Sequence, residues 1–223
     1  MTPRSSPVEQ FMLDAVAEGQ IADAHKCRHV KTHHGLYGVI SASSVRTVLG
    51  AASTSPHGLW LGRAHFTDLL NLADMTYEHP VVFTACVFEN GIDASRSELG
   101  ALTLRNCMAG AHHSVDESSP ATWPALDLTE THISYDVLLW DCHVSGLVCL
   151  RQAVIGGRFD CIGGQFESSG NPALTADNLM TGGGVSLTGR FTSDSEIGTI
   201  CFPGAHIGGQ FYCGPTQIGR EQP

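Results

Sequence analysis

The sequence predicts an all-β solenoid in which short strands stack in square coils of about twenty-two residues. Large apolar residues recur every eleven positions, at Leu61, Leu72 and Phe83. A second series with the same period lies five residues behind the first, at Phe66, Tyr77, Phe88 and Leu99. An α-helical face recurs every three or four residues and a half-buried strand every two, so alternating steps of five and six fit neither. They fit short strands joined by corners, with one large side chain per strand pointing inward.

Both series resume after an interruption, which extends the solenoid along the chain. The first continues at Leu128, Leu139, Leu150 and Cys161, and the second at Ile133, Val144, Ile155 and Phe166. The segment IGGRFDC at 155–161 recurs as IGGQFYC at 207–213. We therefore expect one repeat domain over residues 56–219, with loop insertions near 109–125, 168–184 and 192–197.

Residues 1–55 precede the repeats and predict a short helical cap. Residues 7–19 favour an amphipathic helix, because Pro7 suits its first turn, Glu9 its positive end and Gly19 its stop. A second helix is expected near 42–49. Together the two helices would cover the N-terminal edge of the solenoid, which would otherwise template aggregation.

Composition narrows the class of protein. The chain has 223 residues, of which 42% are apolar and 15% charged, so it can bury a core. Its 25 glycines and 10 prolines argue against a helical bundle. The formal net charge of −10 opposes direct binding to nucleic acid or to an anionic membrane. No apolar signal region and no run of 18 apolar residues is visible, so we expect a cytoplasmic protein whose eight cysteines are reduced.

Several units carry a family resemblance. Segments 62–66 (GRAHF), 72–75 (LADM) and 85–88 (ACVF) resemble degenerate pentapeptide repeats. Segment 204–211 (GAHIGGQF) and its partner at 152–159 resemble units of an actinobacterial branch whose members often carry an "oxidoreductase" label. The resemblance covers roughly residues 8–219 and implies a right-handed quadrilateral β-helix. Proteins of this family include gyrase-protecting DNA mimics, antibiotic self-resistance factors and many others.

Acidic residues are spread along the repeat and, being charged, should point outward. We expect a non-enzymatic binding protein with an acidic surface. The most specific form of this expectation is that the acidic rod mimics DNA and thereby protects or inhibits a topoisomerase, in antibiotic resistance or self-immunity. The alternative reading is that the acid excess only keeps a solenoid soluble. The candidate binding residues are Trp123, in the 109–125 insertion, and Asp68, Asp74, Glu89, Asp93, Asp136 and Asp141.

Two other functions stay open. One is an enzyme of specialised metabolism, of cyclase or isomerase type, with a groove between the inserted loops and one solenoid face. Outward His143 or His206 would then be the acid–base residue. The other is an end-to-end scaffold or homodimer joined through the C-terminal coil around Phe211, Tyr212 and Ile218. No dinucleotide or flavin motif is present, so no cofactor is expected.

Metal binding has one weak candidate. His25, Cys27 and His29 alternate in a segment that also contains His33 and His34, and could converge on zinc. The interspersed basic residues disfavour a dication, and the alternative is a solvated loop joining the two cap helices. Cys86 and Cys107 lie twenty-one residues apart and are expected to stack on one outer face, either for a disulfide or metal or as small packing residues.

Overall fold

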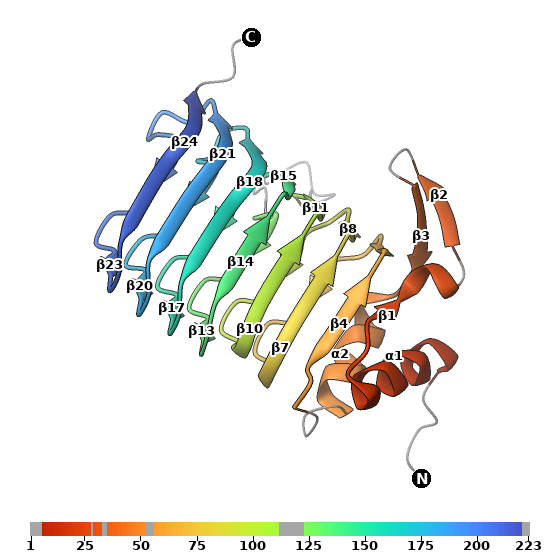
Figure 1. Ribbon diagram of the computed structural model, residues 1–223. Coiled ribbons are helices and arrows are strands. Elements are labelled where there is room, and N and C mark those ends of the chain that lie inside the picture. The colour runs from red at the N-terminus through yellow and green to blue at the C-terminus, as the bar shows by residue number, and fades with distance from the viewer. Residues whose placement is uncertain (1–5, 28, 33–34, 52–55, 112–122, 220–223) are drawn as a thin grey trace.

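The computed structural model describes residues 6–27, 29–32, 35–51, 56–111 and 123–219. This part of the chain is mostly β-strand in parallel ladders, with two α-helices (Figure 1). The described strands form an 18-stranded sheet and a six-stranded sheet. The helices lie at the N-terminal end of the stacked strands, and the strands nearest the C-terminus lie at the opposite end (Figure 1).

Helix α1 (Pro7–Glu18) confirms the prediction for residues 7–19. The Glu9 N–H donates to Ser6 Oγ at 3.2 Å and the Ser6 N–H donates to Glu9 Oε2 at 2.7 Å, so both ends of a capping box are made. Gly19 ends the helix in the left-handed region, at φ 65°. Helix α2 (Ala42–Ala51) packs against α1 and confirms the second predicted helix.

The segment between the helices contains structure that the sequence did not predict. Strand β1 (Ala22–Asp23) and a 3₁₀ turn, η1 (Ala24–Lys26), are followed by an antiparallel hairpin of β2 (His29–Thr32) and β3 (Gly35–Val39). Strands β1 and β3 pair in parallel with the first repeat strands. The cap therefore also contributes the first strands of the stack.

Seven longer strands lie side by side across the view of Figure 1, and we call them the front ladder. They are β4 (Leu59–Gly62), β7 (Thr76–Thr84), β10 (Glu98–Arg105), β14 (Val137–Trp140), β18 (Phe159–Ser168), β21 (Val185–Ser193) and β24 (Phe211–Gly219). Each pairs in parallel with the next. We call the chain between two register partners, such as Leu61 and Phe83, one layer.

Two further ladders extend this sheet. The lower ladder joins the beginnings of β7 and β10 to β13 (His132–Ile133), β17 (Val154–Ile155), β20 (Met180–Thr181) and β23 (His206–Ile207). The upper ladder joins β5 (Ala64–Phe66), β8 (Val87–Phe88), β11 (Met108–Gly110) and β15 (His143–Ser145) to the ends of β18, β21 and β24.

The six-stranded sheet lies on another side of the core. Its strands are β6 (Leu70–Asn71), β9 (Ile92–Asp93), β12 (Leu126–Asp127), β16 (Val148–Cys149), β19 (Leu174–Thr175) and β22 (Ile200–Cys201), paired in parallel in that order. One apolar residue of each strand points inward, and five of these six residues are fully buried, the exception being Ile200 in the last strand.

The core consists of side chains stacked in register, as the eleven-residue series predicts. Every residue of both series, from Leu61 to Phe166, is buried. Phe66 stacks on Phe88 with ring centroids 5.0 Å apart, and Phe166 on Phe191 at 4.7 Å. Because most of the described strands have only two to four residues, we expect stability to come mainly from this stacking between layers.

One of the expected loop insertions differs in the structure, and another is only partly described. Residues 168–184 are not one loop, because β19 and β20 lie within them and pair with the neighbouring layers. Of the 109–125 insertion, residues 112–122 lie outside the described part of the chain. The described helices are all too short or too polar to cross a membrane.

Candidate functional site

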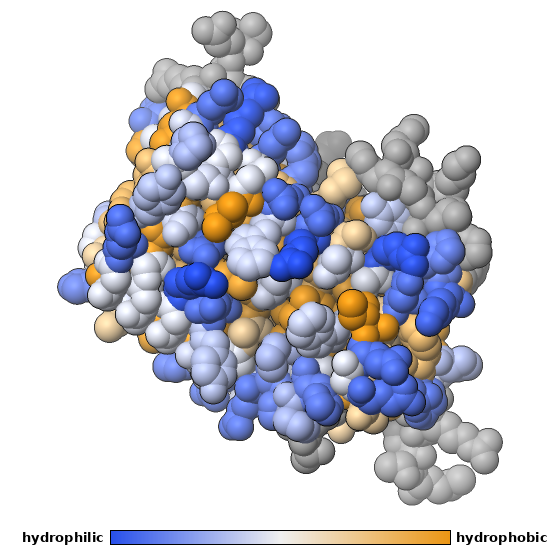
Figure 2. All heavy atoms as spheres, viewed as in Figure 1, coloured by the Kyte–Doolittle hydropathy of each residue, from blue (hydrophilic) through white to orange (hydrophobic). Residues whose placement is uncertain are grey.

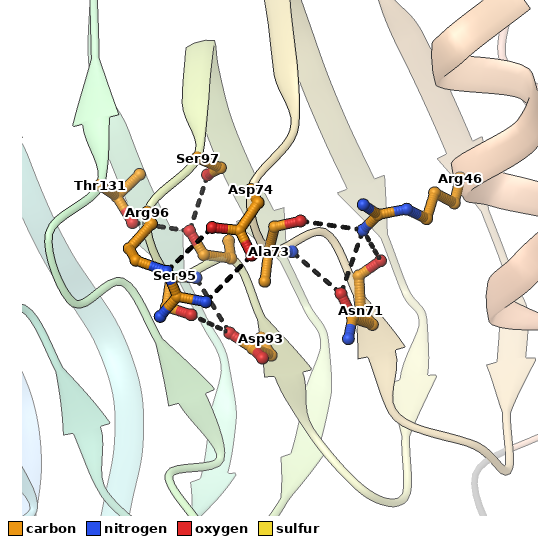
Figure 3. Close-up of polar contacts among 10 residues, drawn as sticks. Arg46, Asn71, Ala73, Asp74, Asp93, Ser95, Arg96, Ser97 and Thr131 are labelled. Atoms are coloured by element: carbon orange, nitrogen blue, oxygen red, sulfur yellow. Dashed lines mark hydrogen bonds and ion pairs between the residues drawn. The ribbon is translucent and has the colours of Figure 1, made fainter.

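A groove of about 560 Å³ lies between α2 and the first strands of the six-stranded sheet, β6 and β9. Three of the predicted binding residues, Asp68, Asp74 and Asp93, line it. The groove also contains two arginines that the sequence analysis did not single out, Arg46 and Arg96. Figure 3 shows Arg46 reaching from the helix towards Asn71, and Arg96 lying against Asp74.

Arg46 joins α2 to the edge of the six-stranded sheet. Its Nη1 donates to the carbonyl oxygens of Asn71 and Ala73, at 3.1 and 3.0 Å, and to Asn71 Oδ1 at 3.1 Å. In the next layer the equivalent carbonyls, of Asp93 and Ser95, accept backbone N–H groups from the layer before. β6 begins the sheet, so Arg46 supplies the donors that a preceding strand would otherwise provide.

Asp68 lines the groove beside the first turn of α2. Its Oδ2 and Oδ1 accept the Ala42 N–H at 3.2 and 3.4 Å. A carboxylate here satisfies a free donor of the first turn and lies at the positive end of the helix dipole. The side chain is thereby held in place, although it is exposed.

Asp74 and Arg96 occupy equivalent corners of successive layers, both in the left-handed region, at φ 56° and 54°. The guanidinium is bidentate, with Nε to Oδ1 at 2.8 Å and Nη2 to Oδ2 at 3.0 Å. This hydrogen bonding with Arg96, helped by the charges of Arg96 and Arg46, lowers the pKa of Asp74. Asp74 therefore stays ionised at neutral pH and is not a general acid.

Asp93 holds the bend that follows β9. Its Oδ1 accepts the Ser95 N–H at 2.9 Å and the Ser95 hydroxyl at 2.7 Å. Behind it, the hydroxyls of Ser97 and Thr131 both donate to the buried Ala94 carbonyl at 2.7 Å (Figure 3). The floor of the groove is therefore fixed by hydrogen bonds, and its charges have set positions.

The other predicted acids lie outside this groove. Glu89 Oε1 is 2.7 Å from His65 Nε2, and this histidine is nearly buried although its position in the strand faces outward. Asp136 accepts the Arg158 N–H at 2.9 Å and pairs with its side chain. Asp141 is exposed at a corner of the upper ladder, at φ 53°. The seven candidates thus divide between one groove and several separate positions.

Trp123 is 50% exposed and directly follows the part of the insertion outside the described residues. It is a large apolar surface side chain and stays a candidate for contact with a partner.

The two candidate catalytic histidines lie on different faces. His143 belongs to β15 in the upper ladder, where its Nε2 is 3.4 Å from Ser145 Oγ. His206 belongs to β23 in the lower ladder, where its Nδ1 donates to the Gly204 carbonyl at 3.0 Å. The structure therefore does not bring the two histidines together.

The proposed metal ligands are only partly described. His25 lies in η1 and Cys27 just after it, and burial together with the charge of Asp23 raises the pKa of the Cys27 thiol. His29 lies on β2, and His33 and His34 fall outside the described residues. Within the described chain, no three His, Cys, Asp or Glu side chains are grouped to hold a metal ion.

Cys86 and Cys107 are buried, so the prediction that they stack on an outer face is wrong. Each follows a corner residue with positive φ, Ala85 or Asn106, which turns the thiol inward. Their thiols donate to the Leu61 and Phe83 carbonyls of the preceding layer, both at 3.5 Å. They are small core residues that also bond between layers.

Arg46 was not expected at the site, because its partners lie 25 and 27 residues further on and belong to a strand edge. The available signal was one basic residue in an otherwise uncharged predicted helix. Comparison with known proteins adds no relative, since no family model, curated protein or solved structure matches the chain.

Proposed function

We propose that residues 56–219 form a right-handed quadrilateral β-helix. Four sets of parallel pairings, in the front, lower and upper ladders and the six-stranded sheet, support one coil of four short faces per layer. Non-glycine residues with positive φ recur at equivalent places, as at Asp74, Arg96 and Glu130, which suits tight corners. Right-handedness follows the strong preference of parallel crossover connections.

We propose further that the protein is a binding module with an acidic surface, whose recognition site is the α2–β6 groove. The observation that carries this proposal is that Asp68, Asp74 and Asp93 are brought into one groove and held by hydrogen bonds before any partner arrives. Preset charges favour binding because little side-chain entropy is lost on association. The partner that they suit is a protein surface rich in donors.

The specific form of this proposal is mimicry of DNA towards a topoisomerase. A net charge of −10 on a stack of layers supports it. Arginines neutralise part of the surface, since Arg96 pairs with Asp74 and Arg158 with Asp136. We therefore expect the contacts with the partner to concentrate on Asp68 and Asp93, which form no ion pair with a described residue.

Supercoiling by purified gyrase, with the full chain added at micromolar excess, tests this proposal. The expected result is inhibition, or protection against a quinolone, which weakens in the Asp68→Asn, Asp93→Asn double variant. Asparagine keeps an acceptor oxygen at both positions and removes only the charge. The control is Asp177→Asn, which removes an acidic charge that pairs with Arg151 away from the groove. An inactive wild-type protein rejects the mimicry.

End-to-end stacking is a second candidate function, and a specific observation favours it. Phe211 is 48% exposed although its register partner Val185 is fully buried, and Ile218 is exposed beside buried Phe191. Residues 197–219 contain no Asp, Glu, Lys or Arg. In this apolar layer without charged residues, β24 has no partner on its outer side among the described strands, and such an edge suits contact with a second copy. The enzymatic alternative has no comparable support, because among the described residues neither His143 nor His206 forms a hydrogen bond or ion pair with an aspartate or glutamate side chain.

A further inference from the structure

The lower ladder carries two adjoining clefts of opposite character. The first, about 440 Å³, is lined by Glu78, Glu98, Leu99, His132, Ser134 and Tyr135. The second, about 410 Å³, is lined mostly by apolar side chains and glycines around Met180, together with Thr181 and His206. Neither lining includes lysine or arginine.

Register pairing places the two clefts next to one another on the lower ladder, and we call the two clefts together the channel. Glu98 pairs with His132, His132 with Val154, Val154 with Met180, and Met180 with His206, so these five residues form one outward column. At roughly 4.8 Å per layer the column is about 19 Å long. The strands concerned, β13, β17, β20 and β23, lie side by side in Figure 1.

Glycines account for the depth of the apolar cleft. A Cβ at Gly156 would lie 2.2 Å from the Ser134 carbonyl oxygen, and one at Gly182 would lie 2.2 Å from that of Gly156. The backbone of successive layers therefore requires glycine here, and a trough without side chains runs beside Val154, Met180 and His206. Met180 is 53% exposed along it. The repeated Gly-Gly pairs of the sequence thus shape a surface as well as a corner.

The acidic cleft is unneutralised. Neither Glu78 nor Glu98 makes a side-chain hydrogen bond or ion pair with any described residue, although five other acidic residues in the described part of the chain pair with arginine. Tyr135 stands at the rim, 65% exposed, with its backbone fixed by a hydrogen bond to the Gly100 carbonyl. An aromatic ring beside two carboxylates is the combination that binds organic ammonium groups.

We propose that this channel binds a small amphiphilic organic cation, with its ammonium group between Glu78, Glu98 and Tyr135 and its apolar body along Val154 and Met180. The volumes of both clefts are those of small-molecule sites. The polarity changes at one step of the ladder, from His132 to Val154, so a ligand must carry its charge at one end. The site lies on a different face from the α2–β6 groove and does not depend on the function proposed there.

Calorimetric titration of the full chain with octyltrimethylammonium chloride, below its micelle-forming concentration, tests the proposal. We expect saturable binding that is tighter than that of tetramethylammonium, which lacks the chain, and of 1-octanol, which lacks the charge. The Glu78→Gln, Glu98→Gln double variant should bind the cation about five- to tenfold more weakly. Both residues are exposed, so the variant should fold normally.

Glu130→Gln is the matched control, because it removes the same charge from an exposed corner outside both clefts and should leave binding unchanged. Met180→Ser should weaken binding of octyltrimethylammonium but not of tetramethylammonium. Equal affinity of the double variant and the wild type would overturn the proposal. So would equal binding of 1-octanol, or binding of a basic peptide where the free ammonium compound does not bind.

Discussion

Arg46 satisfies two carbonyl oxygens at the outer edge of β6, so the Arg46→Ala variant should be less stable by about 1 kcal/mol. Urea unfolding measures this difference as a lower midpoint at unchanged slope. Arg46→Lys keeps a donor and should recover part of the loss. Arg190→Ala removes an exposed arginine without an ion pair to any described residue and should change stability by less than about 0.5 kcal/mol. If the two alanine variants are equally stable in urea unfolding, Arg46 does not stabilise the edge of β6.

Replacing Tyr77 should have the opposite effect on stability. Its side chain is buried and its hydroxyl has no hydrogen-bond partner among the described residues. Tyr77→Phe removes an unsatisfied polar group and should leave stability at pH 7 unchanged or raise it by up to about 1 kcal/mol.

The same residue gives a pH dependence. Burial raises the pKa of Tyr77 to about 12, whereas an unfolded tyrosine titrates near 10. The raised value means that the unfolded chain loses the proton first. Stability is therefore intact below about pH 10 and falls as the pH rises towards 12. The gap between Tyr77→Phe and the wild type should widen over this range in urea unfolding, and a constant gap would contradict the burial of the phenol.

At the scale of elements, the same substitution at two glycines should change stability in opposite directions. Gly156→Ala places a Cβ against the Ser134 carbonyl and should destabilise the protein by about 2 kcal/mol or more. Gly50 lies in α2 with nothing within 4 Å of an added Cβ, so Gly50→Ala should stabilise by about 0.5–1 kcal/mol. Thermal unfolding of both variants checks the pair. A neutral Gly156→Ala would mean that the layers can separate at this corner.

The elements that depend on local signals could be predicted from the sequence. Helix α1 is an example, because Pro7, Glu9 and Gly19 act within its own turns. The core columns could also be predicted, since a residue such as Phe66 needs only its periodic partner, Phe88. The β2–β3 hairpin could not, because its segment is polar and shows no clear alternation.

The candidate site could be predicted only in part, for a related reason. The aspartates of the groove were identified because outward acids follow from the repeat. Their gathering into one groove depends on where α2 docks, and this is set by its buried apolar residues and by the contacts of Arg46 with residues 25 and 27 positions further on. The thiols of Cys86 and Cys107 point inward because the corner residue before each has a positive φ. This φ could not be predicted from the type of those residues. The sequence pattern thus indicates which residues are buried, whereas only the pairing of strands in successive layers shows which residues lie close together.

At the scale of the whole molecule, the two ends of the stack differ. The N-terminal end is covered by α1, α2 and the hairpin, and its core residues are fully buried (Figure 1). In the last layer, Phe211, Tyr212 and Ile218 are exposed on a strand with no described neighbour beyond it. The outward face of the front ladder mixes apolar with hydrophilic side chains (Figure 2) and does not explain this contrast between the ends.

Layer stability should therefore fall towards the C-terminal end, because each layer is stabilised mainly by its two neighbours. In a monomer, amide hydrogen exchange should be slow in β10 and β14 and fast in β24. A second copy that stacks on this end would pair β24 with β24 and slow its exchange as protein concentration rises. Light scattering at tens of micromolar should then report a dimer, and Ile218→Asp should restore the monomer and the fast exchange. A strict monomer whose β24 exchange is independent of concentration would reject end-to-end stacking while leaving the gradient along the layers intact.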